Sequence, residues 1–389
     1  MIRAVAGMLS PSRFPPAPLH DKNETICAVV LKEHGAAENL LYQEDFPAPT
    51  PNPKTRHVVV AVSHAGLNPV DFKMRKYNIS DFAYPKPKIL GSDISGRVLF
   101  APKGSTFAVG DRVFGMLPLL GSQFGGYASR CCIDESFLCR APENVSLRDL
   151  ASIPLVACTI VVALRAVVVA FKGETTGKKC FIQAGSGGVG TFAIQYCANV
   201  LGMYVSTTCS PRNFDLVRSL GATEVIDYHT ENIEDRIQDF DIFIDTLGYA
   251  TESIVLDTKS KILKRDGPQQ SHYIRIASSP YNINEHGSEP KLMTKDPLGM
   301  AIPEASIFRV MQGFSKQFFS SCSKVRYHFI LVRPDRSALE EAAVAMRDEK
   351  IRAIIQEVIP LQDVVRAHRE LESGHVTGKL VLSINESLV

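Results

Sequence analysis

The 389-residue sequence has no tryptophan, hardly any net charge and no regular cysteine framework. Its 43 Lys and Arg residues nearly balance its 41 Asp and Glu residues, which argues against nucleic acid as the main partner. The nine cysteines follow no regular spacing, so we expect reduced thiols in an intracellular protein. A chain of this length can form two domains, each with a large core.

Long apolar runs are also scarce, and only residues 153–171, "IPLVACTIVVALRAVVVAF", approach the length that spans a bilayer. Arg165 lies near the middle of this run, where a charge is costly in lipid. Pro154 stands near its beginning. We therefore predict a buried helix that leads into a domain core, and no transmembrane segment.

The first twenty residues contain no acidic residue, and the first one along the chain is Asp21. With Arg3 and Arg13 this segment resembles a transit peptide, and the mitochondrion is the expected destination. Its four prolines favour the other interpretation, a disordered tail on a cytoplasmic protein. We treat residues 1–25 as an N-terminal extension.

From residue 26 to about residue 150 the sequence consists of short strand-like runs broken by Gly and Pro. Examples are residues 57–68, 95–101 and 110–116. Runs of this kind with frequent turn signals predict a compact, barrel-like β domain.

After residue 178 strand-like and helix-like runs alternate, which predicts a parallel, doubly wound sheet. The expected strands are 178–184, 203–209, 223–228 and 240–248, with helices at 191–202 and 213–222. The irregular stretch 258–300 is predicted to contain surface loops. The tail from about residue 329 reads as helix, strand, helix, strand, over 337–350, 353–360, 364–374 and 378–384.

Four glycines stand in the segment "AGSGGVG", between a predicted strand and a predicted helix. Gly185, Gly187 and Gly190 fit the pattern G-x-G-x-x-G, which in this context predicts dinucleotide binding. The first glycine permits the tight turn, the second lets the backbone approach a diphosphate, and the third lets the helix pack against the strand. The diphosphate would lie at the positive end of the helix. The predicted contacts are Gly185, Ser186, Gly187, Gly188, Val189 and Gly190.

The end of the second predicted strand lacks the acidic residue that binds the ribose 2′-hydroxyl of NAD. Residues 205–213 contain no acid and offer Ser210, Arg212 and Asn213 instead. An arginine there suits a 2′-phosphate, so NADPH is the expected cofactor. Arg212 as a surface charge is the other interpretation. Tyr228 either reaches the same phosphate or packs beside the adenosine.

Several motifs resemble the medium-chain dehydrogenase/reductase superfamily: the "AGSGGVG" loop and the closing "SGHVTGKLVLSI". "GLNPVDFKMR", "ILGSDISGRV" and "GGYAS" resemble its zinc-free quinone oxidoreductase branch. The resemblance covers residue 26 to the end. It implies a groES-like catalytic domain from residues 26–155 and 329–389, a Rossmann domain from residues 156–328, and a cleft where they meet. It also implies a homodimer and hydride transfer from NADPH to a quinone or an α,β-unsaturated carbonyl.

The zinc ligands of the alcohol dehydrogenase branch are missing from this sequence. Asn68, Ser92 and Leu155 stand where that branch has its ligands, and Cys158 is displaced from the third position. The four-cysteine lobe that would bind a structural zinc is absent too. We therefore expect no metal, and a reaction other than metal-assisted alcohol oxidation.

Without a metal, a donor must meet the negative charge that develops on the acceptor oxygen. Asn68 is the first candidate, through its side-chain amide, although an asparagine before Pro69 also suits a structural turn. Lys73 and Tyr77 are candidate proton donors, because related reductases often carry a tyrosine on this run. Solvent is the alternative proton source.

The resemblance implies further cofactor contacts outside the glycine loop, although residues 250–325 depart from the family pattern. These contacts are Thr159, Leu247, Gly248, Ala277, Ser278, Phe329, Val332 and Lys379. Two other functions stay open: an NADPH-binding regulatory or assembly protein with little turnover, and an enoyl reductase that acts in trans for a polyketide synthase.

Overall fold

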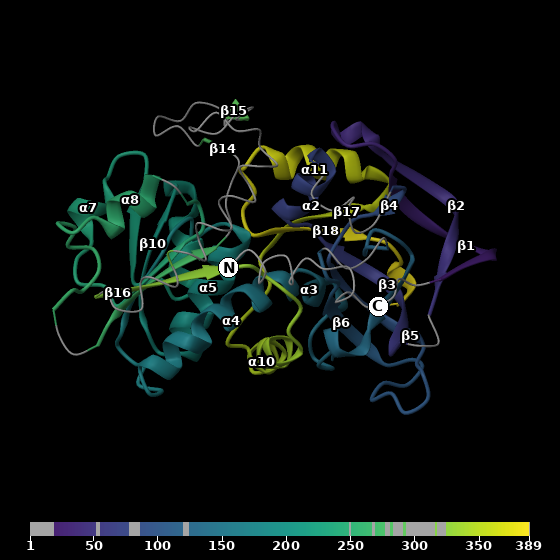
Figure 1. The fold of residues 1–389 in the computed structure, drawn as a ribbon, viewed down its shortest axis with the longest axis horizontal. Coiled ribbons are helices and arrows are strands. Elements are labelled where there is room, and N and C mark those ends of the chain that lie inside the picture. Colours follow the sequence, from purple (N-terminus) through teal and green to yellow (C-terminus); the bar gives the residue numbers. More distant parts are fainter. Residues whose placement is uncertain are drawn as a thin grey trace. The chain divides into compact units, whose positions relative to one another are not determined.

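Figure 1 shows the computed structural model. It describes residues 19–51, 55–77, 86–119, 124–248, 250–266, 269–276, 281–282, 291–292, 316 and 324–388. The chain divides into two units, which we describe separately. Unit 1 contains residues 1–158 and 333–389, and unit 2 contains residues 159–332.

Unit 1 is built on an antiparallel sheet with strand order β17-β18-β3-β5-β6-β8, in which β7 also pairs with β3. The strands are β3 (His57–Gly66), β5 (Asp93–Phe100), β6 (Arg112–Met116), β7 (Arg130–Asp134), β8 (Leu138–Arg140), β17 (Ile355–Pro360) and β18 (Lys379–Ser383). Only the β17–β18 pair is parallel among these ladders. All ten residues of β3 are buried, so this strand forms the centre of the sheet.

The C-terminal segment completes this sheet. Val381 of β18 lies opposite Gly66 of β3, and Figure 1 shows the yellow β17 and β18 beside β3. A second, smaller sheet has the order β2-β1-β4. Its strands are β1 (Leu19–Leu31), β2 (Leu40–Thr50) and β4 (Lys88–Ile89). Residues from the start, middle and end of the chain therefore share the core of unit 1.

The helices of unit 1 follow the expected patterns. In α10, residues three and four apart are buried, such as Leu339, Ala342 and Met346, and the Asp335 carboxylate caps the first turn by accepting the Ala338 N–H at 2.9 Å. The α-helices are α2 (Pro69–Lys76), α3 (Leu147–Ala151), α10 (Arg336–Arg347) and α11 (Val364–Glu372). The short helical turns are η2 (Ala37–Asn39), η3 (Glu135–Phe137), η7 (Leu361–Asp363) and η8 (Glu386–Leu388).

Unit 2 contains a fully parallel sheet with the order β11-β10-β9-β12-β13-β16. The strands are β9 (Lys179–Ile182), β10 (Tyr204–Cys209), β11 (Glu224–Asp227), β12 (Ile242–Asp245), β13 (Ser271–Ile276) and β16 (Val325–Ile330). Numbered along the unit, this order is 3-2-1-4-5-6, the order of dinucleotide-binding sheets. The predicted Rossmann fold is confirmed. Buried β13 also shows that residues 258–300 are not loops throughout.

The helices of unit 2 connect these strands. They are α5 (Gly188–Gln195), the π-helical turn η4 (Tyr196–Val200), η5 (Pro211–Asn213), α6 (Phe214–Ser219), α7 (Ile233–Arg236) and α8 (Ala250–Leu256). A short pair of strands, β14 (Tyr281–Asn282) and β15 (Lys291–Leu292), stands apart from the main sheet.

The apolar run at residues 153–171 forms α4 (Pro154–Ala170). Its first two turns are buried, as predicted, but Ala166, Val169 and Ala170 near its end are exposed. None of the helices in the described ranges is long and apolar enough to cross a membrane.

Candidate functional site

The glycine loop between β9 and α5 combines two tightly packed glycines with an open one. A Cβ on Gly185 would lie 2.1 Å from Oγ1 of Thr207 on β10, and a Cβ on Gly190 would lie 2.3 Å from the Ala184 carbonyl oxygen. A Cβ on Gly187 would have one neighbour within 4 Å, the same oxygen at 3.4 Å. The protein's own packing therefore demands glycine at positions 185 and 190 but leaves the space beside Gly187 open.

The beginning of α5 lies at the same place. Gly187 is the N-cap and offers no side-chain oxygen, so the first N–H groups of α5 receive no side-chain cap. Ser186, Gly187, Gly188 and Val189 are partly exposed, whereas Gly185 and Gly190 are buried. An open backbone with free donors at a positive helix end fits a diphosphate. These residues therefore fit a dinucleotide.

The loop after β10 lies beside the loop after β11. Cys209 is opposite Asp227 in the parallel ladder, so the chains leave the sheet side by side at Ser210 and Tyr228. Arg212 is exposed and Tyr228 is 56% exposed, whereas Asn213 is buried. The sheet thus brings the predicted 2′-phosphate residues to one edge, with Asn213 turned inward.

The turn after β12 is held by Asp245. Its carboxylate accepts the N–H groups of Leu247 at 2.9 Å and Gly248 at 2.6 Å, and it also accepts the Tyr273 hydroxyl. Burial raises the pKa of Asp245, and these three donors oppose that shift. Gly248 has φ +81°, a conformation that favours glycine. The turn is fixed at the carboxyl edge of the sheet, where ligands bind in such folds.

The remaining predicted cofactor contacts differ in exposure. Thr159 on α4 is buried, Val332 is half-buried, and Phe329 on β16 packs into the hydrophobic core of unit 2. Their contacts with a cofactor stay predictions. Ala277, Ser278 and residues 1–18 of the N-terminal extension lie outside the described residues.

In unit 1 a buried polar cluster joins Asn68, Asp93 and Lys379. The Asn68 amide donates to Asp93 Oδ2 at 2.9 Å, and Lys379 Nζ donates to Asn68 Oδ1. Lys379 Nζ also lies 3.5 Å from Asp93 Oδ2, and the Leu155 N–H donates to Asp93 Oδ1 at 2.8 Å. Burial raises the pKa of Asp93 and lowers that of Lys379, and their mutual attraction opposes both shifts. Asn68 is 1% exposed, so its amide serves as an internal link.

Asp71 extends this cluster to Tyr127. Asp71 Oδ2 accepts the Asn68 N–H at 2.8 Å and the Tyr127 hydroxyl at 3.0 Å, which fixes the first turn of α2. Burial raises the pKa of Asp71 to about 7. Asp71 therefore belongs to the scaffold of α2, and sequence patterns alone do not identify its neighbours Asp93 and Tyr127. Both stand in quoted motifs, "GSD" and "GGYAS", yet no spacing indicates that they meet.

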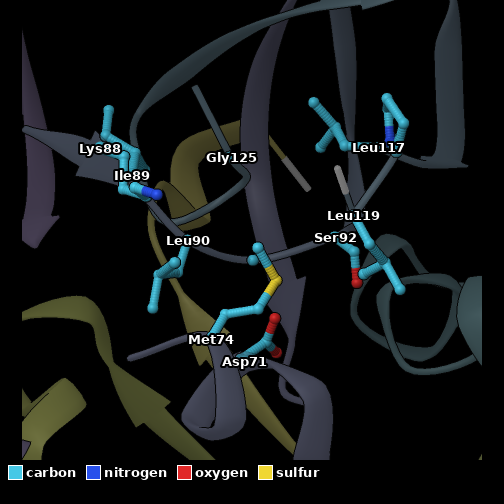
Figure 2. A pocket seen from close by; sticks show the side chains of 11 residues that line it. Asp71, Met74, Lys88, Ile89, Leu90, Ser92, Leu117, Leu119 and Gly125 are labelled. Carbon is cyan, nitrogen blue, oxygen red and sulfur yellow. The ribbon is translucent and has the colours of Figure 1, made fainter. Parts of the chain in front are cut away.

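A small cavity lies beside Asp71 in unit 1 (Figure 2). Its volume is about 20 Å³, enough for about one water molecule. Ser92 Oγ is buried at its wall and has no hydrogen-bond partner among the described residues. The lining residues are Asp71, Met74, Lys88, Ile89, Leu90, Gly91, Ser92, Leu117, Pro118, Leu119 and Gly125. The cavity is too small for a cofactor or a quinone.

Lys73 lies in the last turn of α2 and Tyr77 follows the helix as its C-cap, whose N–H donates to the Lys73 carbonyl at 2.9 Å. Burial lowers the pKa of Lys73 to about 8, and its ammonium has no ion-pair or hydrogen-bond partner in the described chain. The Tyr77 hydroxyl is buried, also without a partner, and burial raises its pKa. The C-terminal end of α2 and its C-cap therefore carry two side-chain donors without partners among the described residues.

The three positions compared with zinc ligands carry no metal-binding set. The Asn68 amide and the Leu155 backbone N–H both donate to the Asp93 carboxylate, and Ser92 lines the small cavity. Cys158 Sγ donates to the Asp335 carbonyl at 3.7 Å. Across the described ranges, no group of three or more His, Cys, Asp or Glu side chains is placed to hold a metal ion.

A parallel sheet with a glycine loop beside its first strand, on a chain whose other unit is an antiparallel sheet, defines a two-domain nucleotide-dependent oxidoreductase. Two family models agree with this class. Residues 54–143 match the alcohol dehydrogenase GroES-like domain, and residues 220–382 match the zinc-binding dehydrogenase model.

Known relatives extend the match to nearly the whole chain. The mitochondrial NAD(P)H oxidoreductase RTN4IP1 of Danio rerio is 30% identical over 379 residues, 92% of this chain and 91% of the relative. The trans-enoyl reductase pgmF of Aspergillus terreus is 30% identical over 342 residues, 85% of this chain and 87% of the relative. The quinone oxidoreductase structure from Coxiella burnetii has a TM-score of 0.71 at 25% identity, covering 93% of this chain and 100% of its own. The chain belongs to the medium-chain dehydrogenase/reductase superfamily.

Within the superfamily, the sequence resemblance to the quinone oxidoreductase branch is confirmed. The motifs "GGVGTFAIQ" and "LVRSLGATEVIDY" further resemble the mitochondrial reticulon-interacting oxidoreductase, in agreement with the Danio rerio relative.

Proposed function

We propose that this chain is a zinc-independent, NADPH-dependent oxidoreductase that reduces a quinone or an α,β-unsaturated carbonyl. The observation that carries the proposal is the glycine loop. Its packing explains glycine at positions 185 and 190, whereas the open space beside Gly187 is explained by a ligand that approaches the backbone. Relatives named as quinone and NAD(P)H oxidoreductases support the reaction class.

The residues of unit 2 bind the cofactor in this proposal. The N–H groups at the beginning of α5 bind the diphosphate, and the loop from Ser210 to Asn213 binds the 2′-phosphate together with Tyr228. Arg212 provides the charge, because a guanidinium forms paired hydrogen bonds with phosphate oxygens. The end of β10 carries no carboxylate that would repel this phosphate. Bound NADPH supplies the hydride.

In this proposal, a residue of α2 supplies the proton that the reduction needs. Hydride addition leaves a negative charge on the acceptor oxygen, and one proton completes the reduction. Lys73 Nζ donates that proton and Tyr77 stabilises the oxygen by hydrogen bonding. Neither side chain has a hydrogen-bond partner among the described residues, whereas the Asn68 amide is bound to Asp93 and Lys379. We therefore assign Asn68 to the positioning of α2.

Two further proposals concern the location of the protein and its oligomeric state. The mitochondrial name of the Danio rerio relative and the basic N-terminus favour mitochondrial location. The homodimer remains a proposal based on the superfamily.

A second candidate is an enoyl reductase acting in trans. It is favoured by the 30% identity with the trans-enoyl reductase of Aspergillus terreus. Both candidates use the same cofactor loop, and they differ in the acceptor.

The test is NADPH oxidation by the purified chain, with a panel of quinones, free enones and enoyl thioesters. Quinone- or enone-dependent loss of NADPH absorbance supports the first candidate, and turnover restricted to enoyl thioesters supports the second. Tight NADPH binding without turnover of any acceptor contradicts both and supports a regulatory or assembly role.

A further inference from the structure

The turn after β11 places one more titratable side chain at the proposed 2′-phosphate site. Cys209 and Asp227 end neighbouring parallel strands in register, and such strands lie about 4.8 Å apart. The residues that follow, up to Arg212 on one side and His229 on the other, leave the sheet at the same edge. A phosphate bound by the first loop therefore lies near the second.

The turn that carries His229 is well defined. Asp227 Oδ1 accepts the His229 N–H at 3.0 Å, and Asp227 Oδ2 accepts the Thr230 hydroxyl at 3.0 Å. The Glu231 N–H donates to the Asp227 carbonyl at 2.9 Å, and Glu231 Oε1 accepts the Asp227 N–H at 3.1 Å. The carboxylate of Asp227 is thus occupied in holding the turn.

His229 and Tyr228 project from this turn as an exposed pair. Their ring centroids are 4.1 Å apart with 39° between the ring planes. Both side chains are exposed, and neither ring forms a hydrogen bond in the described chain. A side chain that packs on Tyr228 and keeps its nitrogens free is available to an anion that Tyr228 also contacts.

The charged groups around the turn leave room for a cation. Glu231 is paired with Arg236 of α7, which also contacts Glu224. From the neighbouring loop comes Arg212, and from β10 comes the Cys209 thiol, whose pKa is raised to about 11 chiefly by burial.

We propose that His229 is a further specificity-determining residue, whose ring N–H binds the 2′-phosphate and so favours a phosphorylated ribose. The inference rests on the proposed function, because it requires the nucleotide site in unit 2. An imidazole ring offers an N–H donor, and hydrogen bonds to a charged group are the stronger kind.

The test compares binding of 2′,5′-ADP and 5′-AMP by calorimetry to the full chain and to two variants, His229→Asn and His229→Lys. We expect His229→Asn to weaken 2′,5′-ADP binding about fivefold. The affinity for 5′-AMP stays unchanged. His229→Lys keeps the strong binding of 2′,5′-ADP, because it again offers a donor to the phosphate.

Three results would overturn the inference. Equal weakening of both nucleotides would show that His229 only supports the Tyr228 ring. Unchanged 2′,5′-ADP binding in His229→Asn would remove His229 from the site and leave the proposed function intact. Failure of the unaltered chain to bind either nucleotide would overturn the proposed function as well.

Discussion

The two polar regions of this molecule differ in whether their hydrogen-bonding groups have partners within the protein. In unit 2 the glycine loop leaves backbone donors open at the beginning of α5, and exposed side chains surround the neighbouring strand ends. In unit 1 Asn68, Asp93 and Lys379 are buried and satisfy one another. The open donors of unit 2 are available to bind a ligand. The buried cluster of unit 1, whose charges satisfy one another, is a closed cluster that stabilises the fold. Among the described elements, α2 combines the two, since it begins in the closed cluster and carries Lys73 in its last turn and Tyr77 as its C-cap.

The largest effect is expected from breaking the closed cluster. Lys379→Met leaves the Asp93 carboxylate buried without its ion-pair partner, and loss of one partner of a buried pair costs about 3–5 kcal/mol of unfolding free energy. Urea unfolding measures this loss. The double variant Lys379→Met, Asp93→Asn is the control and should recover part of it. A single variant as stable as the unaltered chain would show that the cluster does not hold unit 1.

Two glycines of one loop sharpen the comparison. Gly190→Ala places a Cβ 2.3 Å from a backbone oxygen and should cost about 1–3 kcal/mol of stability. Gly187→Ala has room in the protein, so its stability should change by less than about 0.5 kcal/mol while NADPH binding weakens about tenfold. Thermal unfolding and fluorescence titration separate the two quantities. Unchanged NADPH binding in Gly187→Ala would mean that no ligand approaches this backbone.

Arg212 and Arg218 form a matched pair of exposed arginines on neighbouring helical segments. Arg212→Gln should weaken NADPH binding about thirtyfold, the equivalent of about 2 kcal/mol for hydrogen bonds to a charged group, and leave NADH binding unchanged. Arg218 lies near Asp215 and over the Phe214 ring, so Arg218→Gln should leave both affinities unchanged. Equal losses for NADPH and NADH in Arg212→Gln would place Arg212 away from the 2′-phosphate.

The last prediction concerns the pH dependence of turnover. Burial lowers the pKa of Lys73 to about 8, and a proton donor acts in its protonated form. The turnover number should therefore be constant at lower pH and fall as the pH rises through about 8. Lys73→Met should be slower, by about 10²-fold for a general acid, and lose this pH step. A step that persists in Lys73→Met would assign the titration to another group.

The same contrast explains how much could be predicted from sequence. The glycine loop, the alternation of strands and helices and the missing acid after β10 are local patterns, because backbone geometry requires particular residues at fixed spacings. The closed cluster joins positions 68, 93, 127 and 379, which only the folded sheets bring together. The resemblance implies Lys379 as a cofactor contact, and its partner Asp93 cannot be found from spacing. The position of Tyr228 and His229 beside the loop after β10 likewise depends on the register of two strands.

The most direct test of the account is a titration of the purified chain with NADPH and with NADH, followed by nucleotide fluorescence. The account predicts that NADPH binds at least about tenfold more tightly than NADH, because the end of β10 provides Arg212 and no carboxylate. Equal affinity, or a preference for NADH, would contradict the assignment of the Ser210–Asn213 loop. Binding of neither nucleotide would contradict the central claim that the open glycine loop is a cofactor site.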